Sequence, residues 1–393
     1  MSRRARRVPL VVLAVALPVA LNVLPVHGAA SGTTALSPPE MRASLASAVT
    51  TPAGSWAVVA MGQLDRPLNT FWEVFYRAPS ASSWRLATPP GVADNGGLVV
   101  SATAAGAVTV GFEPSQLLRY SPLALSSDDG ASWTPALVPE SLVTTPDALA
   151  VSGGGGSALA LVGRGTGQVL TAKGPLLSWH ALPGGRLLAG GSDARCGVAG
   201  LDAVALSSAS IPLVGTGCRR SGQVGVFAHL GTRWELIGPS LRGSLRGATT
   251  RILRLDSSGV TTTALLAEDG RDGVGLVGLW RSATGTWTES LPLTVGRAPT
   301  VRASALGSTG QQLVFIEEQG KHTVLEETAG PGQPWRRLPA PPSGTGTVSV
   351  QSDGSIDAFS VDGSKLHIFT LALNGTSWSL SQKLNVPIAY GSS

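Results

Sequence analysis

The stretch DALAVSGGGGSALALVGRGTGQVLTAKGPLLSWHALP, residues 147–183, contains four short apolar or alternating segments separated by glycine-rich turns. Short segments of this kind, bounded by such turns, are typical of β-strands. The same plan recurs over residues 346–384, where Asp-Gly and Asn-Gly dipeptides stand at the points that need tight hairpin turns. Each of these stretches therefore predicts a unit of four antiparallel strands.

The tryptophan near the end of this stretch belongs to a series of seven, and neighbouring members are 43 to 55 residues apart. Six of the seven are followed within a few residues by proline. A self-similar period of this length is typical of repeat architectures. Four strands per unit and seven units predict an all-β fold, a seven-bladed β-propeller of four-stranded antiparallel blades. The series is Trp84, Trp133, Trp179, Trp234, Trp287, Trp335 and Trp378.

The predicted propeller occupies residues 31–393, because seven periods use almost the whole chain after a leader at residues 1–30. Two smaller β-domains are the alternative to a single closed propeller. The expected blades cover approximately residues 41–90, 91–140, 141–185, 186–240, 241–295, 296–342 and 343–390.

The leader has the layout of a secretory signal peptide. Four arginines in MSRRARR precede an apolar run, and small residues at VHGAAS offer cleavage after Gly28 or Ala30. The sequence thus predicts a secreted or cell-envelope protein, of bacterial rather than eukaryotic type. The alternative is an uncleaved helix that anchors the chain in a membrane, since the run is nearly long enough to span one.

Charge excludes one class of partner. The chain has 29 basic and 24 acidic residues, and the leader accounts for four of the arginines and none of the acids. The rest is nearly neutral and has no basic run longer than two residues. Because nucleic-acid binding needs a basic surface, we expect no such partner. The two cysteines, Cys196 and Cys218, predict a disulfide rather than a metal site in an exported chain.

Ser126, Asp128, Gly130 and Trp133 in SSDDGASW match the pattern S-x-D-x-G-x-x-W. This pattern resembles the Asp-box of the bacterial neuraminidase (BNR) repeat, found in sialidase-like β-propellers. The other six tryptophan turns are degenerate, because none keeps the aspartate. Glycine stands three residues before the tryptophan at Gly231, Gly332 and Gly375, and Gly285 is displaced by one residue.

The resemblance implies that this box is a turn between the third and fourth strands of a blade, at its periphery and away from the central channel. Asp128 is then expected to accept backbone hydrogen bonds in the turn. Gly130 supplies a positive φ, and Trp133 buries its ring between neighbouring sheets. Asp129 has no part in the motif and is expected to face solvent.

A sialidase-like glycoside hydrolase is the enzymatic alternative. Such enzymes need a tyrosine nucleophile, an arginine triad and an acidic residue, but the chain has only three tyrosines, at positions 76, 120 and 390. The R-I-P motif of that family is missing. Asp147 and Asp202 stand near predicted innermost strands and could face a channel, but the favoured interpretation of each is a cap in a turn or at the start of a strand. The adjacent acid pairs 268–269, 317–318 and 326–327 are expected at solvated hairpin ends, since neighbouring strand residues point to opposite faces.

The histidines have no second ligand at metal-binding spacing, so we expect neither a metal nor a cofactor, and the catalytic residues stay unknown. The leading hypothesis is a monomeric, non-catalytic binding or scaffolding module for a glycan, a cell-surface component or a protein. Two channel-facing carboxylates beside exposed aromatics would favour the hydrolase, and a channel of small apolar, Ser and Thr side chains would favour the binding module. An exposed Trp56, Trp72 or Trp280 would mark a sugar platform.

Overall fold

The computed structural model describes the chain from residue 46 to residue 386 with gaps. The described ranges are 46–63, 70–90, 98–103, 105–112, 123–136, 146–152, 156–163, 165, 167–173, 179–185, 188, 194–241, 248–258, 261–270, 273–295, 299–307, 309–318 and 322–386. All of them belong to the compact unit Leu36–Ser393. The predicted signal peptide, Tyr120 and Tyr390 lie outside the described residues. In the described part of the chain, no helix has the length and apolar character needed to cross a membrane.

The described strands form seven successive meanders, each of four antiparallel strands in chain order. The first comprises β1 (Ala46–Thr51), β2 (Gly54–Gly62), β3 (Thr70–Arg77) and β4 (Arg85–Leu86). The second comprises β5 (Leu98–Ala102), β6 (Val108–Phe112), β7 (Leu123–Ser126) and β8 (Thr134–Ala136). The third comprises β9 (Ala148–Val151), β10 (Ser157–Val162), β11 (Gln168–Lys173) and β12 (Trp179–Ala181).

The remaining four meanders follow the same plan. The fourth comprises β13 (Val198–Leu206), β14 (Pro212–Cys218), β15 (Gly225–Leu230) and β16 (Arg233–Leu236). The fifth comprises β17 (Thr249–Ser258), β18 (Thr261–Gly270), β19 (Gly273–Arg281) and β20 (Trp287–Glu289), with β21 (Leu293–Val295) also on β19. The sixth comprises β22 (Thr300–Leu306), β23 (Gln312–Glu318), β24 (His322–Thr328) and β25 (Arg336–Arg337). The seventh comprises β26 (Thr345–Val350), β27 (Ile356–Asp362), β28 (Lys365–Leu371) and β29 (Ser379–Asn385).

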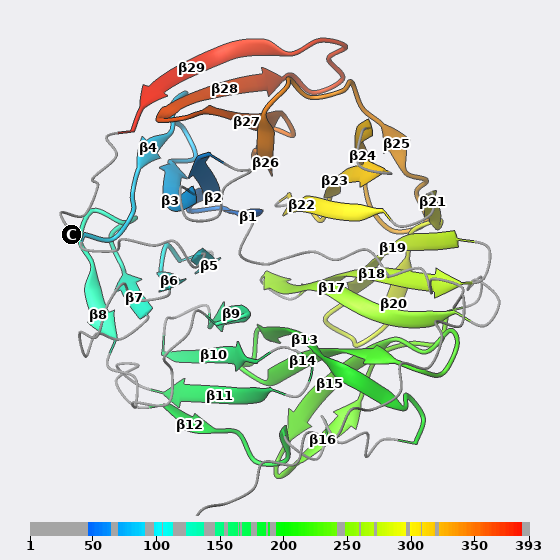
Figure 1. Cartoon of the computed structure of the whole chain (residues 1–393). Coiled ribbons are helices and arrows are strands. Elements are labelled where there is room, and N and C mark those ends of the chain that lie inside the picture. Colours follow the sequence, from blue (N-terminus) through cyan, green and yellow to red (C-terminus); the bar gives the residue numbers. More distant parts are fainter. Residues whose placement is uncertain are drawn as a thin grey trace, which may run out of the picture. The chain divides into compact units, whose positions relative to one another are not determined.

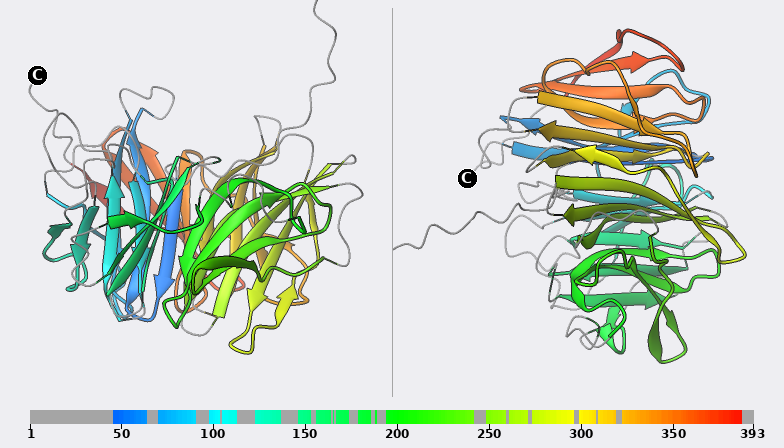
Figure 2. Two further views of the ribbon diagram at one scale, coloured as in Figure 1. Left: turned by 90° about the horizontal axis from the view of Figure 1, so that it is seen from below. Right: turned by 90° about the vertical axis from the view of Figure 1, so that its right-hand side faces the viewer.

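Local chemistry accounts for these strands and their turns. β2 reads GSWAVVAMG, and all but its last residue is buried, because the sheets stack against one another and cover both faces (Figure 2). The turn between β27 and β28 is Gly363-Ser364, and Gly363 has φ of 60°. Asn374 takes φ of 61° in the turn between β28 and β29. Both positions need the left-handed region, which glycine and asparagine adopt most readily.

Within this unit the meanders follow one another in chain order around a common centre (Figure 1). From the first meander to the sixth, each of the five successive pairs is held by its own cluster of buried aliphatic and aromatic side chains. A sixth cluster contains Met61 and Phe75 of the first meander, Leu313 of the sixth, and Phe359 and Ile368 of the seventh. The same apolar packing that joins neighbours in the chain therefore also joins its first and last meanders.

Each of the seven periodic tryptophans stands at the start of the outermost strand of its meander or directly before it. Their rings or indole N–H groups contact the preceding meander. Trp287 donates to the Ile237 carbonyl at 2.7 Å, and Trp378 donates to the Pro339 carbonyl at 3.2 Å. Trp84 continues the series, because its ring meets Phe359 of the seventh meander edge-on, with centroids 4.9 Å apart. The period seen in the sequence is thus a repeated contact between meanders.

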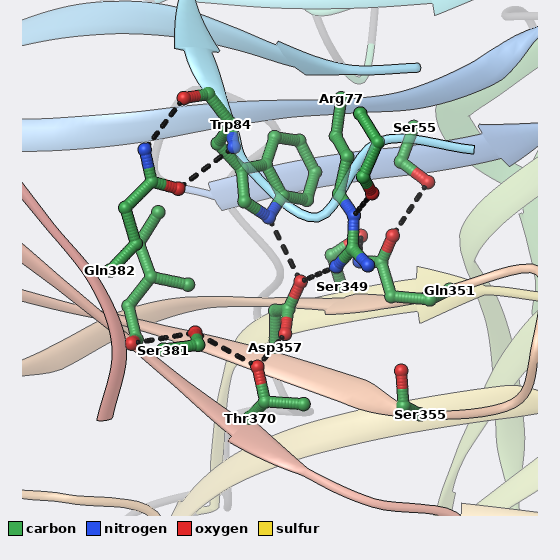
Figure 3. A network of polar contacts seen from close by, with 12 residues as sticks. Ser55, Arg77, Trp84, Ser349, Gln351, Ser355, Asp357, Thr370, Ser381 and Gln382 are labelled. Atoms are coloured by element: carbon green, nitrogen blue, oxygen red, sulfur yellow. Dashed lines mark hydrogen bonds and ion pairs between the residues drawn. The ribbon is translucent and has the colours of Figure 1, made fainter. Parts of the chain in front are cut away.

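A buried carboxylate joins the first meander to the last (Figure 3). Asp357 on β27 is fully buried and accepts from Arg77 Nη1 at 2.7 Å, from Trp84 Nε1 at 2.9 Å and from Thr370 Oγ1 at 2.6 Å. Beside it, the Gln382 side chain bonds both the backbone N–H and the carbonyl of Trp84, each at 2.8 Å. We call this group of side chains the clasp. Residues separated by about 280 positions in the sequence are held here by charge-assisted hydrogen bonds.

The predicted disulfide is confirmed. Cys196 and Cys218 are bonded, and their Cα atoms lie 4.9 Å apart. Cys196 precedes β13 and Cys218 ends β14, so the bond fixes the first hairpin of the fourth meander, and both residues are buried. In the chain-entropy description, closing a loop of this length stabilises the fold by about 3 kcal/mol.

The clasp leads to a prediction about stability. Replacing Asp357 by asparagine removes the charge opposite Arg77 and leaves a mostly buried guanidinium without its counterion. Breaking a buried pair in this way typically costs about 3–5 kcal/mol. We expect Asp357→Asn to lower the free energy of unfolding by about 3 kcal/mol or more in urea denaturation.

The matched control is Asp362→Asn, at the exposed end of the same strand. It should change stability by less than about 0.5 kcal/mol. Equal effects of the two substitutions would contradict the role given to the clasp.

Candidate functional site

A cavity of about 620 Å³ opens where the innermost strands of six meanders end. The innermost strands β1 and β22 run parallel and pair directly through Ser47–Val49 and Ser304–Leu306. Their carboxyl ends therefore lie at the same side of the unit. The strand-end residues in the lining are Thr51, Ala102, Val151, Leu206, Asp256 and Leu306.

The lining of this central cavity is neutral and rich in hydroxyl groups. About half of the described lining residues are serine or threonine, and the rest are mainly small or aliphatic. Trp280 also lines it, but the side chain is only 5% exposed and its N–H already donates to the Gly310 carbonyl at 2.7 Å. Several of these hydroxyls already bond within the protein, among them those of Thr50, Thr51 and Thr288. The surface therefore offers a ligand the remaining hydroxyls and little charge.

Asp256 is the only carboxylate among the described lining residues, and its charge is balanced beside the cavity. Its Oδ2 accepts from Arg254 Nη2 at 3.0 Å. The same guanidinium donates to the Ser304 carbonyl at 2.7 Å and to the Ala48 carbonyl at 2.6 Å, so it ties β17 to β22 and β1. A two-carboxylate glycosidase needs a second acid roughly 5 to 10 Å away, and the described lining supplies none.

The hypothesis that Asp147 or Asp202 faces a channel was wrong for Asp202. Asp202 lies within β13, only 6% exposed, and its carboxylate pairs with Arg251 of the next meander at 2.9 Å. Asp147 is half-buried just before β9 and is not among the described residues that line the cavity. The strand-forming pattern of the sequence does not reveal such pairing, because each partner lies in a different meander.

The three non-repeat tryptophans and Tyr76 are also placed in the core. Trp56, Trp72, Trp280 and Tyr76 are each less than 10% exposed, so none of the three tryptophans offers an exposed sugar platform. The Tyr76 hydroxyl donates to the Ala53 carbonyl at 2.8 Å. Burial, and then the nearby Asp129 carboxylate, raise the pKa of Tyr76 to about 12. A tyrosine with so high a pKa is a poor nucleophile.

The motif SSDDGASW forms the turn between β7 and β8, the third and fourth strands of the second meander. Asp128 Oδ1 accepts from the Ser126 hydroxyl at 2.7 Å and from the Ser132 N–H at 2.9 Å. Its Oδ2 accepts from the Ser132 hydroxyl at 2.5 Å. Gly130 has φ of 75°, and a Cβ there would lie 2.9 Å from the Trp56 ring. The whole turn is thus built on side-chain hydrogen bonds and one obligatory glycine.

This turn lies away from the central cavity, because none of its described residues lines it. The Trp133 ring is half-buried and meets Trp56 of the first meander edge-on, at 6.3 Å between centroids. The expectation that Asp129 faces solvent was wrong in part. Asp129 is half-buried, its backbone has φ of 59°, and its carbonyl accepts from the Arg85 guanidinium. It contributes to the contact between the first two meanders.

The adjacent acid pairs also differ from the solvated hairpin ends that the sequence suggested. Glu326 and Glu327 are buried and pair with Arg337 at 2.9 Å and Arg336 at 2.6 Å. Glu268 is fully buried on β18. Successive side chains on these strands do point to opposite faces, but the neighbouring strand or sheet covers them. Within the described residues, no cluster of His, Cys, Asp and Glu could hold a metal ion.

No protein-family model matches the chain, and no curated protein matches it. Solved structures do resemble it. The GH74 xyloglucanase from Xanthomonas campestris aligns with a TM-score of 0.54 at 15% identity, over 88% of this chain and 55% of that one. YCF48 from Cyanidioschyzon merolae aligns with a TM-score of 0.50 at 12% identity, over 85% and 97%.

These structures are β-propellers. This chain is a β-propeller. At such identities the likeness concerns the fold alone, and the chain spans about half the length of the xyloglucanase.

The turn at Asp128 predicts a pH dependence. Hydrogen bonds from Ser132, and then from Ser126, lower the pKa of Asp128 to about 2, below its usual 3.8. A lowered pKa means that the folded state favours the ionised form, so its contribution to stability is full above about pH 4 and is lost as the pH falls toward 2. We expect Asp128→Asn to lower the melting temperature at pH 6 and to come close to the wild type at pH 2, where about half of Asp128 is protonated.

The control is Asp362→Asn, whose melting temperature should follow that of the wild type at both pH values. A deficit of Asp128→Asn that is the same at pH 6 and pH 2 would contradict the stated role of the carboxylate.

Proposed function

We propose that this protein is an exported, non-catalytic binding module. It would hold a neutral, hydrogen-bonding part of a glycan, a cell-surface component or a protein in the central cavity. The observation that carries the proposal is the chemistry of that cavity. Its described lining offers many hydroxyl groups, small apolar surfaces and a single carboxylate whose charge Arg254 balances. Such a lining suits reversible recognition more than bond cleavage, which needs paired groups with distinct protonation states.

The proposed architecture is a closed seven-bladed propeller of the BNR/Asp-box type, in which the seven meanders are the blades. Two observations support it. The tryptophan contact recurs in every meander, and the first meander makes it with the seventh. The turn at residues 126–133 has the hydrogen bonds that the Asp-box resemblance implies. Closure matters to function, because the cavity exists only where the innermost strands converge.

Export is the second part of the proposal. The arrangement of residues 1–30 predicts a signal peptide with cleavage near Ala29. The disulfide between Cys196 and Cys218 supports an oxidising compartment, where such bonds persist.

The test combines two measurements on the same purified protein. Binding to a glycan array and to arrayed peptides should be detectable, and chromogenic glycosides should not be hydrolysed above the background rate. Thr309→Trp places a large ring on the rim of the cavity, so binding should fall at least about tenfold, as expected when a ligand's contacts are blocked.

Thr323→Trp is the matched control, because Thr323 is exposed on β24 and is not a lining residue. Its binding should equal that of the wild type. Glycoside hydrolysis that Thr309→Trp abolishes would overturn the non-catalytic assignment. Binding that survives in Thr309→Trp would place the site elsewhere.

A further inference from the structure

A second cavity, about 230 Å³, lies between the fourth and fifth meanders. Its lining includes Ser207, Ser208 and Ser282, which also line the central cavity. The two cavities therefore adjoin, and one ligand can extend from the first into the second. We call the second cavity the side groove.

The side groove differs chemically from the central cavity, because much of its lining is aliphatic. Its apolar members come from β14, β15 and the segments beside them. Leu230 is 38% exposed and is the most exposed of the large aliphatic side chains that line the side groove. An exposed aliphatic surface inside a concave site favours an aliphatic group from a ligand, since its burial is worth about 25 cal/mol per Å². The aliphatic lining residues are Ile211, Leu213, Ala228, Leu230 and Ile237.

Arg281, the last residue of β19, is the only ionisable side chain in the described lining of the side groove. It is half-buried, and its Nε atom is buried with no hydrogen-bond acceptor in the described part of the chain. No carboxylate pairs with its guanidinium among the described residues. A buried donor without an acceptor is costly and rare in folded proteins. A ligand in the side groove would meet the two Nη atoms of the same guanidinium, which are not among the buried unpaired atoms of the described residues.

We propose that the side groove binds the C-terminal residue of a peptide or protein that ends in an aliphatic side chain. The terminal carboxylate would accept two hydrogen bonds from the Arg281 guanidinium, the geometry in which arginine binds carboxylates best. The aliphatic side chain would lie on Ile211, Leu230 and Ile237. The preceding residues would run into the central cavity, whose serine and threonine hydroxyls pair with backbone amides. This assignment rests on the proposed function, because it gives the ligand class for the same site.

The side groove favours a peptide terminus over an acidic sugar. A uronic acid would also offer a carboxylate to Arg281, but its hydroxyl-bearing ring would lie on aliphatic side chains that cannot hydrogen-bond to it. Sugar rings are usually held by aromatic side chains, and the described lining of the side groove contains none. A C-terminal leucine, isoleucine or valine can make both contacts. Its side chain covers the aliphatic surface, and its carboxylate pairs with Arg281.

The probe is an array of hexapeptides Gly-Ser-Gly-Ser-Gly-Z, attached through their N-termini, with the last residue Z varied and the C-terminus either free or amidated. The full-length secreted protein should bind the free-carboxylate peptides that end in leucine, isoleucine or valine. Amidation should weaken this binding about tenfold or more, because a hydrogen bond to a charged group is lost. Arg281→Met should weaken it by a similar factor and should bind the free and amidated peptides equally.

Two matched controls test for indirect effects. Arg233→Met removes an exposed arginine on β16 of the neighbouring meander, and Leu373→Ser removes an exposed leucine on the seventh meander. Both should bind like the wild type, whereas Leu230→Ser should bind several-fold more weakly.

Binding that is indifferent to amidation or to Arg281→Met would overturn the inference. Binding to glycans alone, blocked by Thr309→Trp, would overturn it too and leave the proposed function standing. A failure of every glycan and every peptide to bind would overturn both.

Discussion

The carboxylate of Asp357 is the constraint on which the closed arrangement depends. It is fully buried and accepts hydrogen bonds from three side chains. Two of these belong to the first meander of the chain and one to the last. A buried charge is tolerated only when its hydrogen bonds are satisfied, and this one is satisfied only when the two ends of the fold meet. Open arrangements of the same strands would leave it without Arg77 and Trp84. The apolar cluster around Met61 and Phe359 packs this interface, and Asp357 makes its charged contact.

Other contacts between the first and last meanders reach the candidate site. Thr50 and Thr51 of β1 line the central cavity, and the Thr50 hydroxyl donates to the Val350 carbonyl at the end of β26. The contacts that join the first and last meanders thus reach the cavity wall. Arg254 also joins innermost strands beside the cavity, since its guanidinium links β17 to β1 and β22. The cavity is therefore held by polar contacts between innermost strands, and some of the hydroxyls in its lining, such as those of Thr50 and Thr51, are used in bonds within the protein.

Local patterns in the sequence predicted the strands, the turns between them and the repeated unit that each periodic tryptophan marks. Each of these features depends on residues that are close together in the sequence. The disulfide was predictable for a related reason, since two cysteines allow one pairing. Long-range polar pairs were not predictable. Nothing near Asp357 or Asp202 indicates an arginine partner in another meander, and Asp129 becomes half-buried only because the first meander packs on it. The Arg254-x-Asp256 spacing, which places both side chains on one face of β17, was a signal that could have been read. No pattern in the sequence marks Arg281. Its guanidinium stands out only because the described part of the folded chain places no hydrogen-bond acceptor beside its Nε atom.

Hydrogen exchange followed by mass spectrometry on the wild type and Asp357→Asn tests the central claim most directly. If the clasp closes the fold, the substitution will reduce amide protection in β1–β3 and in β26–β28 together. Protection in β10 and β14, on the opposite side of the arrangement in Figure 1, will change little. Loss of protection confined to β26–β29, with β1–β3 unchanged, would contradict the account.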